Sequence, residues 1–259
     1  MIISHVQGNV QANEFALLIA GGNQGIGFET AKNLLCSSAS YHVILGSRKL
    51  ANGQEAVKKL QTEPDTKGTV STITLDVSDD KSVDTAAEKV AADYGRLDIL
   101  VNNAGIVSLA NPPSREQYRE VLNTNVVGSL SMAETFLDLL RKSEERRLVF
   151  VSSSVGSISQ AADPTSRYYG ANAFEYRSSK AALNMLIVLY WNRLQKEGFK
   201  VLGADPGLCA TNFTGNAQSL LDRGAATPAQ GGERIATVVK GEKDADVGRV
   251  LGEYGVSPW

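Results

Sequence analysis

Short apolar segments alternate with helical patterns along most of this chain. Six such runs lead into polar turns, at residues 15–21, 42–47, 69–77, 97–105, 147–154 and 199–207. Their nearly continuous hydrophobicity is typical of parallel strands that are covered on both faces. Between two of them, Val83, Ala87, Val90 and Tyr94 recur with the spacing of one apolar helix face. The alternation predicts an α/β protein with a doubly wound parallel sheet.

Composition favours one such domain and argues against several functions. The 259 residues are 42% hydrophobic and show no repeat or composition break, so we predict a single domain over 1–259 with an N-terminal extension over 1–14. A net charge of −2 argues against a nucleic-acid partner. Two histidines and two cysteines give no basis for a metal site. No signal peptide or bilayer-spanning run is present, so we expect a cytoplasmic protein with no membrane partner.

Two long segments interrupt the alternation. Residues 157–175 and 208–227 each follow a predicted strand at its carboxyl end, where ligands bind in open α/β sheets. Loops of this length in a compact domain are usually functional. We therefore predict that both loops lie on the substrate side, with tolerated surface insertions as the alternative.

A glycine-rich turn follows the first predicted strand. Glycines there allow a sharp turn and a close approach of the backbone to a pyrophosphate, which the amino terminus of the next helix attracts. A plain structural turn is the alternative. The residues expected to hold the cofactor at this turn are Gly21, Asn23, Gln24, Gly25, Ile26 and Gly27.

From this turn onward the chain resembles the short-chain dehydrogenase/reductase family. The glycine spacing is G-x-x-x-G-x-G, and "LDV", "NNAG", "NTNVVG", "VSSSVG", "YRSSK" and "DPG" follow in the family's order. The resemblance extends over residues 15–259 and includes a closing "GVSPW", like that of carbonyl-reductase-type members. It implies a Rossmann fold with a seven-stranded parallel sheet and helices on both faces. One departure is Ala20, where the family usually has a threonine whose hydroxyl steadies the turn.

The residues after the second predicted strand favour a phosphorylated dinucleotide. NAD-binding folds place an acid about 20 residues after the glycine turn, where it bonds the ribose hydroxyls. Here Ser47 and Arg48 occupy that region, and no acid occurs between Glu29 and Glu55. Arg48 can bind a 2′-phosphate through charge-assisted hydrogen bonds, whereas a carboxylate in its place would repel that phosphate. We therefore predict NADP(H), with a solvated Arg48 that binds nothing as the alternative.

The resemblance implies the remaining cofactor contacts. Asp76 would bond the adenine amino group, although an ordinary loop cap is an equally good interpretation of this residue. Asn103 would lie along the adenosine ribose, and Thr211 would reach the pyrophosphate or carboxamide. The full set is Asp76, Val77, Asn103, Ala104, Gly105, Tyr176, Lys180, Pro206, Gly207, Cys209 and Thr211.

Tyr176 and Lys180 are the central catalytic candidates. They are four residues apart and therefore share one helix face. A free tyrosine has a pKa of about 10, and we expect the nearby ammonium, helped by the positive charge of the oxidised nicotinamide, to lower it. In the family's mechanism the tyrosine protonates the carbonyl oxygen as hydride arrives, and the lysine holds the nicotinamide ribose. Tyr168 and Tyr169 are set aside because neither has a cation four positions further on.

The catalytic serine must be chosen from three consecutive serines. In the family it stands three residues before a glycine, so Gly156 selects Ser153. Its hydroxyl would bond the substrate oxygen and stabilise the developing alkoxide. Ser152 and Ser154 should point to the opposite face of an extended segment, although an error of one position stays open.

Asn125 completes the catalytic set that the resemblance implies. It is preferred to Asn123 because "NVVG" matches the family from Asn125 onward. Through its backbone carbonyl, in a locally distorted turn, it would hold a water bonded to Lys180 and so provide a proton path.

These residues together predict NADPH-dependent reduction of a ketone or aldehyde to an alcohol, acting on a small molecule. The alternatives are an NADP-dependent secondary-alcohol dehydrogenase and a catalytically weak dinucleotide-binding sensor or scaffold. Tyr168, Phe174 and Phe213 would give a mostly apolar pocket, unless these aromatics only anchor their loops. The long 157–175 insertion should wall the substrate site and disfavour a tetramer, so we expect a monomer or homodimer.

Overall fold

The computed structural model describes residues 14–214 and 216–259, and an eight-stranded sheet runs through its centre. The strand order is β3-β2-β1-β4-β5-β6-β7-β8. All neighbours from β3 to β7 pair in parallel, and β8 pairs with β7 in antiparallel fashion. The strands are β1 (Phe15–Ala20), β2 (Tyr41–Ser47), β3 (Thr69–Thr74), β4 (Ile99–Asn102), β5 (Arg147–Val151), β6 (Lys200–Ala204), β7 (Val250–Gly252) and β8 (Gly255–Val256).

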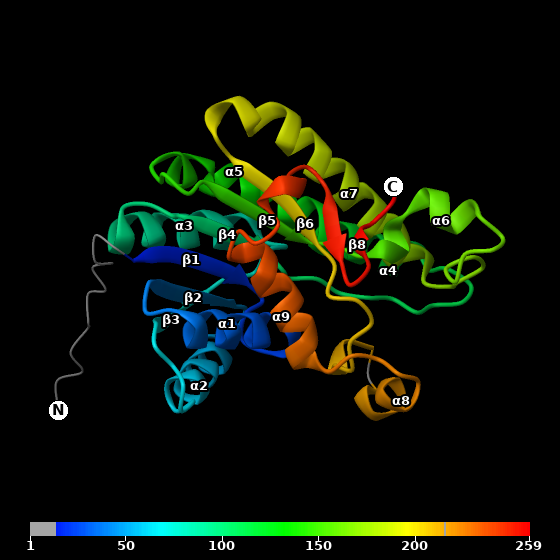
Figure 1. Ribbon diagram of the computed structural model, residues 1–259, viewed down its shortest axis with the longest axis horizontal. Helices are drawn as coiled ribbons and strands as arrows, with labels where there is room; N and C mark the ends of the chain where they lie inside the picture. The colour runs from blue at the N-terminus through cyan, green and yellow to red at the C-terminus, as the bar shows by residue number, and fades with distance from the viewer. Residues whose placement is uncertain (1–13, 215) are drawn as a thin grey trace.

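Helices cover both faces of this sheet (Figure 1). One layer consists of α1 (Gly25–Ser37), α2 (Leu50–Gln61) and α9 (Pro228–Val239). The other consists of α3 (Asp80–Tyr94), α5 (Gly128–Arg141) and α7 (Phe174–Leu194). The shorter helices are α4 (Arg115–Leu122), α6 (Ile158–Ala162) and α8 (Ala217–Asp222). The predicted doubly wound sheet with two helical layers is confirmed.

Strand β1 shows why the predicted strands are apolar at nearly every position. Leu17 and Ile19 belong to the core beneath α1, α2 and α9, whereas Ala16, Leu18 and Ala20 belong to the core beneath α3, α5 and α7. All five are fully buried. Successive side chains of a strand point to opposite faces, so a strand in a sheet that is covered on both sides needs apolar residues at odd and even positions alike.

The sheet has one more strand than the predicted seven. The seven parallel strands are present, and the chain then reverses after Gly252 so that β8 pairs with β7. Gly255 has a φ of 93°, which glycine adopts without steric cost. A two-residue strand carries no hydrophobic period, so the sequence could not indicate it. Of the predicted N-terminal extension over 1–14, only residue 14 lies within the described residues.

The strand order places the carboxyl ends of β1 and β4 side by side. Connections leave β1 toward β2 and β3 on one side, and β4 continues toward β5 and β6 on the other. Ligands of doubly wound folds bind in the crevice at such a switch point. The glycine turn follows β1 and "NNAG" begins at the end of β4, so both predicted cofactor motifs reach it.

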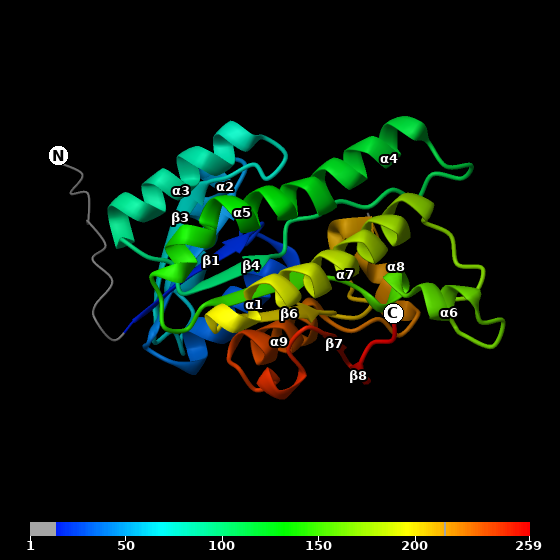
Figure 2. The ribbon, with the colours of Figure 1, turned by 90° about the horizontal axis from the view of Figure 1, so that it is seen from above.

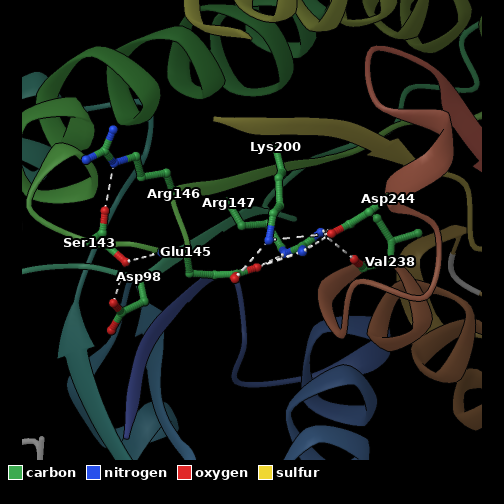
Figure 3. A network of polar contacts seen from close by, with 8 residues as sticks. All are labelled: Asp98, Ser143, Glu145, Arg146, Arg147, Lys200, Val238 and Asp244. Carbon is green, nitrogen blue, oxygen red and sulfur yellow. Dashed lines mark hydrogen bonds and ion pairs between the residues drawn. The ribbon is translucent and has the colours of Figure 1, made fainter. Parts of the chain in front are cut away.

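An ion-pair network lies at the opposite, amino-terminal ends of the strands (Figure 3). Arg147 begins β5 and is 1% exposed. Its guanidinium donates to Asp244 at 2.6 and 2.9 Å, to Glu145 at 2.8 Å and to the Val238 carbonyl at 3.2 Å. Lys200, which begins β6, pairs with Glu145 at 3.0 Å. Burial lowers the pKa of Arg147, but the two carboxylates outweigh it and the pKa is raised.

Membrane-spanning helices and metal-ligand clusters are absent from the described residues. No described helix is both long and apolar enough to cross a membrane. The longest, α7, has 21 residues and carries Glu175, Arg177, Lys180 and Arg193. Within the same part of the chain, no three His, Cys, Asp or Glu side chains are grouped as metal ligands.

Candidate active site

The predicted glycine turn connects β1 to α1. Gly21 and Gly25 have φ angles of 70° and 57°, in the left-handed region that glycine adopts freely. A Cβ on Gly27 would stand 2.5 Å from the Gly21 carbonyl oxygen and 2.6 Å from Asn103 Nδ2. Only glycine therefore lets the first turn of α1 pack this closely on the loop.

The Asn103 side chain braces this turn. Its Nδ2 donates to the carbonyl oxygens of Ala20 at 2.9 Å and Gly21 at 3.1 Å. The turn is thus steadied from β4 at the point where Ala20 replaces the family's threonine. The Asn103 amide group is already engaged there, while Ala104 lies beside Gly21 and Gly105 beside Asn125.

The amino terminus of α1 fits a dinucleotide pyrophosphate. Gln24 caps the helix without a side-chain hydrogen bond, and in the described chain no acidic residue stands in its first turn. Gly25 is exposed, and the Thr211 methyl group would lie 4.0 Å from a Cβ at that position. Free N–H groups and a positive dipole end therefore face the predicted phosphate position.

Gly27→Ala should disrupt this cradle. The added methyl group meets backbone and amide atoms at 2.5–2.6 Å, so we expect a loss of about 1–3 kcal/mol of unfolding free energy, as in other overpacked sites. Dinucleotide affinity, measured by fluorescence titration, should fall as well. Gly95→Ala is the control, because Gly95 is also constrained at φ 75° but has no neighbour within 4 Å in the described chain. If both variants bind the dinucleotide equally, the cradle does not depend on Gly27.

The residues predicted for the adenosine end lie at the carboxyl ends of β2 and β3. Arg48 is exposed, and the Ser47 hydroxyl donates to the Lys49 carbonyl at 2.9 Å. Asp76 accepts from the Ser78 N–H at 3.0 Å and from its hydroxyl at 2.6 Å, which is the loop cap considered as the alternative. Burial tends to raise the pKa of Asp76, but these bonds and the charge of Arg48 lower it overall. The charge of Arg48 therefore reaches Asp76 across the ends of β2 and β3.

The loop after β6 holds Pro206, Gly207 and Cys209. The Pro206 carbonyl accepts from Arg234 at 2.7 Å and from the Cys209 thiol at 3.3 Å. A Cβ on Gly231 of α9 would stand 2.5 Å from Cys209 Sγ, so the thiol is turned toward α9. Burial raises the pKa of this thiol to about 11. Any cofactor contact from Cys209 would therefore come from its main chain.

Lys180 lies one turn after Tyr176 on α7. Its Nζ is 5.4 Å from the centre of the Tyr176 ring and donates to the Val151 carbonyl at 2.7 Å. The side chain is buried, which lowers its pKa to about 8, while the charge of Asp205 acts in the opposite direction. Lys180 therefore remains mostly protonated at neutral pH, and its ammonium lies at the carboxyl end of β5.

The groups of the chain itself do not lower the Tyr176 pKa, and the part of the expected lowering that the oxidised nicotinamide would supply stays a prediction. Burial raises this pKa, and the charges of Asp205 and Cys209 add to the effect. The Lys180 ammonium donates its hydrogen bond to the Val151 carbonyl. Tyr176 is consequently held as the neutral phenol, which is the form that can donate a proton.

The three consecutive serines have different partners. Ser152 is buried and donates to Asn184 at 2.5 Å. Ser154 donates to Asp205 through both its N–H and its hydroxyl. Ser153 accepts only a long 3.4 Å bond from the Val155 N–H, among the described residues. Ser153, which the family motif selects, therefore has the weakest hydrogen bonding of the three serine hydroxyls.

Asn125 lies in the distorted turn that the resemblance implied. Residues Asn123–Val127 form a π-helical turn between α4 and α5. The Asn125 amide group bonds the Ile106 N–H and carbonyl, and donates to Ser179 Oγ at 2.9 Å. Ser179 in turn donates to the Tyr176 carbonyl at 2.7 Å. The Asn125 carbonyl accepts from the Ser129 hydroxyl at 2.8 Å, and the water that it would hold stays a prediction.

Both predicted substrate loops lie at the carboxyl-terminal end of the sheet (Figures 1 and 2). In the second loop, the Phe213 ring meets the Tyr176 ring edge-on with centres 5.8 Å apart. In the first, Tyr168 contacts Arg167 and Phe174 is 56% exposed. One of the three predicted pocket aromatics therefore touches Tyr176. On α7, Met185 is 59% exposed and Leu189 is 53% exposed, and the oligomeric state stays a prediction.

Sequence reasoning did not include Ser179 and Asp205 in the site. Ser179 links Asn125 to Tyr176, and Asp205 is the carboxylate whose charge acts on both Tyr176 and Lys180. Their positions within "YRSSK" and "DPG" were the available signal. Their partners come from segments far away in the sequence, so spacing alone could not indicate these roles.

A doubly wound sheet with a glycine turn and a bare helix terminus at its switch point defines a dinucleotide-binding protein. The family model for short chain dehydrogenase matches residues 16–221. The chain therefore belongs to the short-chain dehydrogenase family, whose members are oxidoreductases that use a nicotinamide dinucleotide on small-molecule substrates.

Individual relatives agree with this assignment. The short-chain dehydrogenase/reductase tropE of Talaromyces stipitatus is 36% identical over 253 residues, covering 91% of this chain and 94% of the relative. The short-chain dehydrogenase anuI of Penicillium roqueforti is 43% identical over 206 residues, with coverages of 77% and 80%. The NADPH-bound carbonyl reductase from chicken fatty liver superposes with a TM-score of 0.78 at 26% identity, covering 95% of this chain and all of that one.

Proposed function

We propose that this protein reduces a ketone or aldehyde to an alcohol with NADPH. The observation that carries the proposal is the group at the end of β5 and the start of α7. Lys180 is buried 5.4 Å from the centre of the Tyr176 ring and donates to the Val151 carbonyl, two residues before Ser153, whose hydroxyl accepts one long bond among the described residues. The bound dinucleotide would supply the hydride, and Gly21, Gly25 and Gly27 with the α1 terminus would hold its pyrophosphate.

Each of these side chains has a distinct role in the proposal. Ser153 donates a hydrogen bond to the substrate oxygen and so orients the carbonyl carbon. Tyr176 carries the proton that this oxygen takes as it becomes an alcohol, and its raised pKa keeps the proton in place beforehand. The Lys180 ammonium, 5.4 Å from the centre of the Tyr176 ring, and the positive charge of the oxidised nicotinamide would together stabilise the tyrosinate that is left after transfer. Ser179 and Asn125 hold the backbone of Tyr176 in position.

The preference for NADPH rests on Arg48. It is exposed directly after the carboxyl end of β2, and the chain has no acid between Glu29 and Glu55 that would repel a 2′-phosphate. The related carbonyl reductase from chicken fatty liver was solved with NADPH bound. A charge-assisted contact to the phosphate contributes about 1.5–3 kcal/mol, which corresponds to roughly tenfold to hundredfold in affinity.

Cofactor oxidation followed by absorbance tests the proposal. The protein, with NADPH and a panel of ketones, aldehydes and quinones, should show turnover with at least one carbonyl and a higher kcat/KM for NADPH than for NADH. Arg48→Ala should lower kcat/KM for NADPH by about tenfold to hundredfold and leave that for NADH nearly unchanged. Lys58→Ala, an exposed cation near the end of α2, is the matched control and should change neither value. A wild-type preference for NADH would overturn the NADPH assignment.

A further inference from the structure

Asp205 is a buried carboxylate at the junction of three chain segments. It directly follows β6 and is 5% exposed. Its Oδ2 accepts from the Ser154 N–H at 2.7 Å and from the Ser154 hydroxyl at 2.5 Å, and its Oδ1 accepts from the Gly207 N–H at 2.8 Å. Its own N–H donates to the Leu251 carbonyl of β7 at 2.8 Å. One side chain thus joins the loops that follow β5 and β6.

The Ser154 end of this junction bears directly on Ser153. Ser153 is extended, with φ −161° and ψ 143°, so neighbouring side chains point to opposite sides. With the Ser154 hydroxyl and N–H held by Asp205, the Ser153 hydroxyl is directed away from that carboxylate. The orientation of Ser153 is therefore set by the group that binds its neighbour.

The rest of this segment is attached to α7 on both sides of the serines. The Val151 carbonyl accepts from Lys180 at 2.7 Å, and the Val155 carbonyl accepts from Arg177 at 3.0 Å. A Cβ on Gly156 would stand 2.7 Å from the Lys180 carbonyl carbon, so the segment and the helix are in close contact. The bonds to Lys180 and Arg177 hold residues 151–155 close to α7. The bonds from Ser154 to Asp205 then determine which side of this segment faces α7.

We propose that Asp205 is a positioning residue for the reduction, acting through Ser154 to aim the Ser153 hydroxyl at the substrate oxygen. The proposal rests on the proposed function. The carboxylate also bonds the loop that carries Gly207, so it keeps the Ser153 segment and the β6 loop in one arrangement. Its charge raises the pKa of both Tyr176 and Lys180, which places it within electrostatic reach of the reacting groups.

A double-mutant cycle between Asp205 and Ser153 tests this role. Asp205→Asn keeps the side-chain size but offers an N–H where the carboxylate accepted one, so it should lower kcat by about tenfold or more in the wild-type background. In the Ser153→Ala background, where there is no hydroxyl left to aim, the same change should lower kcat by less than about threefold. A purely structural role for Asp205 would give equal losses in the two backgrounds, and that result would overturn the proposal.

Two further variants keep the test decisive. Ser257→Ala removes the 2.8 Å contact between the Ser257 and Ser154 hydroxyls but leaves the bonds to Asp205, so kcat should stay within about twofold. If Asp205→Asn does not fold, Ser154→Ala replaces it in the cycle, with a smaller loss that should also vanish when Ser153 is absent. A loss from Ser154→Ala that persists without Ser153 contradicts the proposal.

The failure of this inference is distinguishable from failure of the proposed function. If none of the carbonyl compounds in the panel supports NADPH oxidation by the wild-type protein, the proposed function is wrong. A crystal structure of Asp205→Asn then still decides the positioning role, because the Ser153 hydroxyl should be displaced relative to Tyr176. An unchanged Ser153 in that structure would exclude Asp205 as the residue that orients it.

Discussion

Tyr176→Phe should lower kcat for carbonyl reduction by at least about a hundredfold, the usual scale of general acid catalysis. The substitution removes only the phenol oxygen and keeps the ring, whose edge-on contact with Phe213 should be preserved. Dinucleotide affinity should stay unchanged, since the predicted pyrophosphate site is the glycine turn and the α1 terminus. Stopped-flow absorbance at saturating NADPH and a fluorescence titration measure the two quantities separately.

Tyr168→Phe is the matched control for this prediction. Tyr168 is half-buried in the predicted substrate loop and contacts Arg167, but it has no lysine one turn later. Its variant should retain kcat within about threefold, far from the range expected for loss of a general acid. If Tyr176→Phe reduces carbonyls as fast as the parent protein, Tyr176 is not the acid. A comparable loss in both variants would indicate a packing effect of the loop.

The layered sheet could be predicted because it depends on local patterns. Each of the six predicted runs contains a strand of the structure. Leu17 and Ile19 face one core while Ala16 and Leu18 face the other, which is why odd and even positions both had to be apolar. The edge strand β8 could not be predicted, because two residues beside a glycine turn leave no period to detect. Its pairing depends on β7, whose position is set by β6.

The candidate site shows a similar division. The serine motif selected Ser153 by counting back from Gly156, and the partners of Ser152 and Ser154 leave that hydroxyl the least committed. The direction of the Tyr176 pKa could not be obtained in the same way. Helical spacing places Lys180 near Tyr176, but burial and the charge of Asp205 depend on which loops close over them.

Arg147→Met should produce the largest loss of stability. The methionine keeps most of the apolar stem but removes a guanidinium that is 1% exposed and bonds Asp244, Glu145 and the Val238 carbonyl. Removing one partner of a buried ion pair typically costs about 3–5 kcal/mol, because the other charge is left uncompensated. Here Asp244 and Glu145 are partly exposed and Lys200 remains within 3.5 Å of both, so we expect about 3 kcal/mol, at the lower end of that range.

Urea unfolding with an unchanged m-value would measure this loss directly. For a domain of this size it corresponds to a fall of roughly 6–12 °C in Tm. Arg141→Met is the matched control, since Arg141 also forms two ion pairs, with Asp138 and Glu197, but is 39% exposed. Solvent screens both of these ion pairs, so Arg141→Met should shift the urea midpoint several-fold less than Arg147→Met. Equal shifts in the two variants would mean that burial of the Arg147 network adds nothing to the stability of the strand ends, because both arginines would then contribute only as exposed charges do.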